Sequence, residues 1–130
     1  MKKITLIARL LLGLIFFGAG ISFFFMGTPP PMEGPIGEFF KGMVATHYFL
    51  YLLKGTETIC GLLLLSGFFV PLALVVLAPI ILNIFLVHSF IMPQGVPLAI
   101  VLGILEIYLA FFSKEYSATI KHLFRLRPAV

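Results

Sequence analysis

The sequence predicts an all-α integral membrane protein that folds as one four-helix bundle over residues 1–130. Composition is the first indication, because 61% of the residues are hydrophobic and only 11% are charged, whereas a soluble domain carries about 25% charged residues. The second is that residues 10–32 and 58–105 contain no charged side chain, and about 20 apolar residues suffice to cross a bilayer. The sequence therefore excludes a soluble domain and a disordered chain. Its single cysteine, Cys60, also excludes a disulfide-stapled module.

The first span is predicted near residues 4–26. Its apolar run ends at Gly27 and the three prolines of residues 29–31, which cannot continue a helix. The apolar region of a signal peptide is only about 7 to 15 residues long. This longer run is therefore expected to stay in the protein as a transmembrane helix.

The loop after the first span, residues 27–46, is the only long one between the predicted helices. Ile36, Phe39, Phe40 and Met43 recur in it at helical spacing. This pattern predicts a short helix lying on the outer membrane surface. An irregular loop whose aromatic side chains dip into the interface is the alternative.

The other three spans are predicted near residues 47–67, 71–92 and 96–113, followed by a tail at 114–130. Gly67 and Pro71 bracket a tight turn between the second and third spans, and the segment 93–97 makes the next turn. Pro79 lies inside the third span and should kink it, because proline has no backbone N–H.

Basic residues set the predicted orientation. With the N-terminus in the cytoplasm, the outer loops hold only Lys41, and the inner side holds Lys2, Lys3, Arg9, Lys114, Lys121, Arg125 and Arg127. Cytoplasmic segments of membrane proteins carry such an excess of Lys and Arg. Both termini are therefore expected in the cytoplasm. The net charge of +4 is a feature of membrane topology and predicts no nucleic-acid partner.

Five polar residues inside the predicted spans are the candidates for an intramembrane site: Arg9, Lys54, Glu57, Asn83 and Glu106. At about 1.5 Å of rise per residue, they fall at two depths, Arg9 with Glu106 and the other three together. A charge at the bilayer centre costs at least about 2.5 kcal/mol, so we expect pairing, and in particular an Arg9–Glu106 pair. The group is either a proton path or polar pocket for a small redox molecule such as a quinone, or a set of ion pairs that fixes helix register.

His47 and His88 are weak ligand candidates. Two histidines can bind haem or a metal, but these two lie at predicted helix ends and outside any metal-binding motif. Histidines at the membrane interface are the simpler interpretation, and no metal site is predicted.

The order and spacing of several motifs resemble the DoxX family. They are Ala8-Arg9-Leu10, Lys54-Gly55-Thr56-Glu57, Phe69-Val70-Pro71, Leu77-Ala78-Pro79, Asn83, His88 and Leu105-Glu106-Ile107. The resemblance covers about residues 4 to 112. It implies a four-helix protein of the bacterial inner membrane, related to a small subunit of thiosulfate:quinone oxidoreductase. The family has no agreed catalytic residues, so none is assigned to this chain.

Three functions are compatible with these features. The first is an accessory or scaffold subunit of a larger membrane complex, such as a respiratory one, with partners among other membrane subunits or further copies of the chain. The second is a quinone-linked redox subunit of a membrane oxidoreductase, which would handle the quinone through Glu57, Glu106 and nearby aromatic side chains. The third is a small transporter, although small four-helix exporters carry a glutamate in their first helix, where this chain has Arg9.

The charge asymmetry predicts the result of a topology experiment. Reporter fusions at Val130 and near Gly34 should report cytoplasmic and external positions respectively, because Lys and Arg are retained inside. The reverse pattern would overturn the orientation.

Overall fold

A computed structural model describes residues 2–26, 33–91, 93–114 and 116–123, and these ranges contain helices and turns but no strand. The proline-rich segment 27–32 and the tail beyond residue 123 lie outside the described residues. The elements, in order, are α1 (Lys2–Met26), α2 (Gly34–Ala45), α3 (Phe49–Ser66), α4 (Val70–Phe90), the 3₁₀ turn η1 (Pro93–Gly95), α5 (Val96–Ile107), the π-helical turn η2 (Tyr108–Phe112) and α6 (Ser117–His122).

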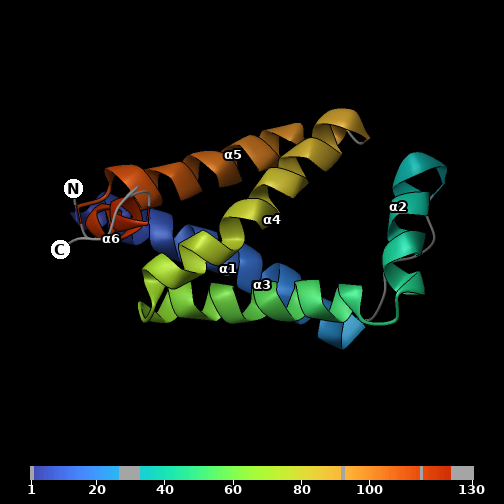
Figure 1. Ribbon diagram of the computed structural model, residues 1–130, viewed down its shortest axis with the longest axis horizontal. Coiled ribbons are helices and arrows are strands. Elements are labelled where there is room, and N and C mark those ends of the chain that lie inside the picture. Colours follow the sequence, from blue (N-terminus) through green and yellow to red (C-terminus); the bar gives the residue numbers. More distant parts are fainter. Residues whose placement is uncertain (1, 27–32, 92, 115, 124–130) are drawn as a thin grey trace.

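The four predicted spans are confirmed. Helices α1, α3, α4 and the segment Pro93–Phe112 are each long and apolar enough to cross a membrane. The helix predicted in the outer loop is also present as α2, which stands crosswise to α1 and α3 at one end of the molecule (Figure 1). Its buried Met43 packs with Phe23 of α1 and Leu50 of α3.

Helices α1 and α3 are antiparallel neighbours whose backbones touch (Figure 1). A Cβ atom added to Gly61 would lie 2.7 Å from the Phe17 Cα atom and 2.8 Å from the Gly13 carbonyl oxygen. One added to Gly20 would lie 2.7 Å from the Thr58 nitrogen. Glycine is the residue that permits such close approach in lipid, where packing rather than hydrophobicity joins helices.

Helix α4 turns back from α3 and runs along the bundle to meet α5 near the α5 N-terminus (Figure 1). The α3–α4 turn is made by residues 67–69. Gly67 has a φ of 85° and donates its N–H to the Leu63 carbonyl at 2.9 Å, as a helix C-cap does. Phe69 has a φ of 54°, and Pro71 opens the first turn of α4.

The main core joins α1, α3, α4, α5 and α6. Its most buried large side chains include Phe16, Leu64, Leu77 and Leu109. The α1–α3 and α4–α5 pairs lie together at the end that holds α6 and diverge toward the end that carries α2 (Figure 1). The bundle is thus held together mainly at one end.

The backbone contact at Gly61 predicts a large effect of one methyl group. Gly61→Ala should destabilise the protein by about 1 to 3 kcal/mol, the usual cost of overpacking, because the new Cβ meets backbone atoms of α1 that cannot move aside. Gly55→Ala is the matched control on the same helix, since nothing lies within 4 Å of its added Cβ. Thermal unfolding of the purified protein in detergent measures both. Equal melting temperatures for the two variants would contradict the contact.

Candidate functional site

Lys54 and Glu57 form an ion pair one turn apart on α3. The distance from Lys54 Nζ to Glu57 Oε2 is 3.2 Å, and the side chains are 24% and 6% exposed. The carboxyl is therefore inside the protein and its partner is at the edge. Asn83, expected at the same depth, does not join them, since its side chain is exposed on α4.

Arg9 does not pair with Glu106, so that expectation is wrong. The Arg9 Nη1 atom instead donates to the Tyr116 hydroxyl at 3.4 Å, and it lies against Gly67, where an added Cβ would be 2.6 Å away. The missing side chain at Gly67 leaves room for the guanidinium at the α3–α4 turn. A long basic side chain near a helix end commonly reaches toward the membrane surface in this way.

This end of the bundle is a junction between the first span and the end of the chain. Thr5 Oγ1 lies 3.0 Å from Tyr108 Oη, which links α1 to η2, in addition to the Arg9–Tyr116 bond. Ile120 of α6 is buried in the main core. Arg9 therefore serves to connect elements, and the Arg9 Nε atom stays buried without a hydrogen-bond partner.

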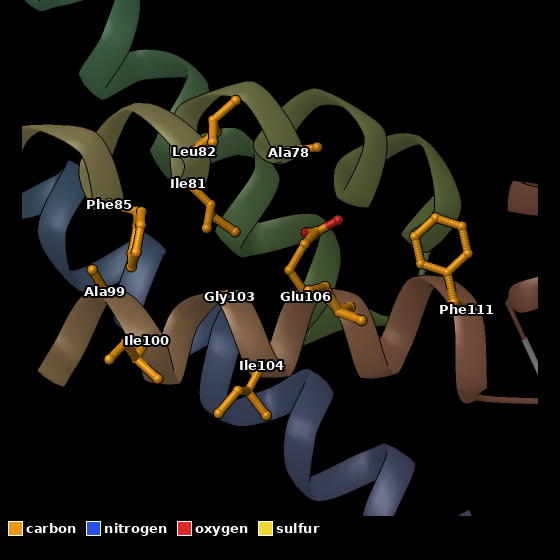
Figure 2. A pocket seen from close by; sticks show the side chains of 11 residues that line it. Ala78, Ile81, Leu82, Phe85, Ala99, Ile100, Gly103, Ile104, Glu106 and Phe111 are labelled. Carbon is orange, nitrogen blue, oxygen red and sulfur yellow. The ribbon is translucent and has the colours of Figure 1, made fainter. Parts of the chain in front are cut away.

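Glu106 lies at a groove between α4 and α5 with a volume of about 430 Å³. Its side chain points from α5 toward α4, and in this view Phe85 and Phe111 stand on either side of it (Figure 2). The residue is only 8% exposed, and its Oε1 atom has no hydrogen-bond partner. The other lining residues are apolar: Ala78, Ile81, Leu82, Phe85, Ala99, Ile100, Gly103, Ile104, Ile107 and Phe111.

Small residues open this groove. Ala99, Gly103 and Glu106 share a face of α5, and small residues on one helix face commonly mark a helix-packing surface. Yet nothing lies within 4 Å of a Cβ added at Gly103. Gly103 therefore leaves open space on this face of α5. Sequence reasoning missed the α4 wall, because nothing in the spacing of Ala78, Ile81 and Phe85 distinguishes a groove from a lipid-facing surface.

The electrostatics of the two carboxyl groups differ. Within the described ranges, Lys54–Glu57 is the one ion pair, so Glu106 has no cation beside it. A carboxyl group accepts hydrogen bonds when ionised and can donate one when protonated. A buried polar atom without a partner is costly, so Oε1 is suited to a ligand that brings a hydrogen-bonding group into the groove.

A family model described as DoxX matches residues 4–89. This chain belongs to the DoxX family. The match includes Arg9, Lys54, Glu57 and Asn83 and ends one residue before the end of α4. Helix α5 and Glu106, which the expected range to about residue 112 includes, lie beyond the match. Comparisons with curated proteins and with solved structures found no match.

The two histidines of this DoxX protein lie in separate surroundings. His47, with a φ of 67°, lines a small cavity of about 240 Å³ beside Met43 and Tyr51. The His88 Nδ1 atom is 2.8 Å from the Ile84 carbonyl oxygen, and its ring covers Gly95, where a side chain would collide with it. Across the described residues, no three or more His, Cys, Asp or Glu side chains are grouped to hold a metal ion.

The DoxX structure predicts coupling between Lys54 and Glu57 but none between Arg9 and Glu106. Lys54→Met should destabilise the protein by about 1 to 3 kcal/mol. This is less than the cost of about 3 to 5 kcal/mol for removing one partner of a fully buried ion pair, because Lys54 is partly exposed. Combining it with Glu57→Gln should recover part of that loss, since neither charge is then left alone. Unfolding of the single and double variants in detergent measures the coupling. Arg9→Met combined with Glu106→Gln serves as the comparison, and the effects of these two substitutions on unfolding should add. Strict additivity of the Lys54 and Glu57 substitutions would show that the ion pair does not stabilise the protein.

Proposed function

We propose that this DoxX protein is a small subunit of a larger membrane complex and that it binds a lipid-soluble molecule of the quinone class between α4 and α5. The observation that carries this proposal is the buried Glu106 carboxyl group, unpartnered at Oε1, in an apolar groove. The family and the charge pattern support a bacterial inner membrane location with both termini in the cytoplasm.

The groove fits a quinone ring in size and chemistry. Binding pockets for small molecules are typically about 300 to 1,000 Å³, mostly apolar, with few polar groups that fix orientation, and this groove has about 430 Å³ and one carboxyl. Phe85 and Phe111 supply aromatic surface on either side of Glu106 (Figure 2). Several lining residues, among them Leu82, Ile100 and Ile104, are exposed on the outside of the bundle. A molecule dissolved in the bilayer therefore has access from the side.

A bound quinone would supply two-electron redox chemistry, and the protein's part would be to bind and orient it. Glu106 can accept a hydrogen bond from a hydroxyl of the reduced form, or donate one to a carbonyl of the oxidised form when protonated. Ala99 and Gly103 leave room for the ring beside the carboxyl group. Glu57 is less suited to this role, because Lys54 Nζ lies 3.2 Å from its Oε2 atom as an ion-pair partner, whereas Glu106 has no cation beside it in the described part of the chain.

Two substitutions test the groove. Glu106→Leu should weaken quinone binding about 10-fold or more, since a hydrogen bond to a charged group contributes about 1.5 to 3 kcal/mol. Gly103→Leu should block binding by filling the groove without disturbing the fold, because the added side chain meets open space. Labelling of the protein in lipid nanodiscs by a photoreactive quinone analogue measures both.

Glu57→Gln is the matched control for these variants, since it alters a buried carboxyl outside the groove, and labelling should stay at the level of the unaltered protein. Full labelling of both Glu106→Leu and Gly103→Leu would refute the quinone site.

An accessory or scaffold role without a ligand is the second candidate function. Asn83 favours it, because an exposed carboxamide within a membrane span needs a hydrogen-bonding partner from outside the chain, which another subunit or a second copy of this chain can supply. Purification from the native membrane in a gentle detergent should then recover other subunits in fixed ratio with the protein. Recovery of the chain without any other subunit would argue against this role.

A further inference from the structure

One side of α4 forms a continuous exposed ridge. Its residues recur at alternating spacings of four and three, and all are exposed: Leu72, Val76, Pro79, Asn83, Leu86 and Phe90. This is the heptad spacing at which two helices cross with left-handed packing. The buried residues Ala73 and Leu77 face the core from the opposite side of the helix, so the ridge points away from the rest of the chain.

The ridge carries a polar side chain, Asn83, and lies beside a break in the hydrogen bonding of α4. The Asn83 side chain is exposed and makes no hydrogen bond within the described part of the chain. Pro79 has no N–H, so the Val75 carbonyl one turn before it loses its helical donor. Asn83 lies about 20 Å from the Val70 end of the helix at 1.5 Å per residue, well inside a hydrocarbon core of about 30 Å. Water does not reach polar groups there, so leaving them bare in lipid is costly.

We propose that the α4 ridge is a dimer interface for a second copy of this chain, in which the two Asn83 carboxamides hydrogen-bond to each other. A carboxamide has both donors and an acceptor and is therefore complementary to itself. Two copies inserted with the same topology have parallel α4 helices, which places each Asn83 at the depth of its counterpart. A single asparagine in a helix seam fixes register and partner number in this manner.

The dimer is independent of a ligand at Glu106, because the groove and the ridge use different residues of α4. The groove uses Ala78, Leu82 and Phe85, none of which belongs to the ridge. A negative result in the quinone-labelling experiment would leave the dimer proposal standing, and a negative result in the dimer experiments would leave the quinone proposal standing.

Cysteine cross-linking in native membranes tests which side of α4 meets the second copy. In the full chain carrying Cys60→Ala, Val76→Cys and Leu86→Cys should each form a disulfide-linked dimer on mild oxidation, since equivalent ridge residues face each other across the axis. Ala78→Cys is the matched control from the groove side of α4, since Ala78 is exposed but lies well away from the ridge around the helix, and it should stay monomeric. Dimer formation at Ala78 equal to that at Val76 would overturn the proposal, as would cross-linking of the ridge to a different protein in place of a second copy.

Replacement of Asn83 tests the hydrogen bond itself. Asn83→Leu should weaken self-association about 3- to 30-fold, the range expected for a polar contact between membrane helices, and Asn83→Gln should largely preserve it. Thr56→Val is the control, because the exposed Thr56 hydroxyl already donates to Leu52 of its own helix at 2.8 Å, and the variant should dimerise normally. The dimer fraction is measured by single-molecule photobleaching in lipid bilayers across a range of protein-to-lipid ratios. An unchanged dimer fraction in Asn83→Leu would overturn the assignment.

Discussion

The close approach of α1 and α3 at Gly13, Gly20 and Gly61 is the contact on which the remaining structure depends. The two backbones touch there. On the same helix α3, Glu57 is buried and pairs with Lys54. The two other spans then pack against one side of this pair and only toward one end. The divergence of α4 and α5 from the pair follows from that geometry.

The spans were predictable because each depends on local properties of the chain. Uncharged runs and the breakers Gly67 and Pro71 locate them to within a few residues, and the spacing from Ile36 to Met43 predicts α2. The Lys54–Glu57 pair follows from a spacing of three on one helix. Each of these features depends on a single continuous segment of the sequence and on no contact between distant segments.

The arrangement between spans was less predictable. Equal depth suggested an Arg9–Glu106 pair, but depth is only one coordinate, and the direction in which each side chain points depends on which helix faces meet. The missing side chain at Gly67 leaves room for Arg9 at the α3–α4 turn, and the open space beside Gly103 leaves Glu106 at a groove. Likewise, nothing in the sequence shows that Asn83 points away from the core.

The short α3–α4 turn has a consequence for how the chain enters the membrane. Helix α3 carries Lys54 and Glu57 and is the least apolar of the four spans, whereas α4 is the most apolar. Residues 67–69 leave too little chain between them for either helix to insert far from the other. Transfer of α4 into the bilayer therefore offsets the cost of bringing the α3 charges with it, and the two helices should be integrated during biosynthesis as one hairpin. Lengthening the turn would separate these steps and leave α3 to insert on its own marginal hydropathy.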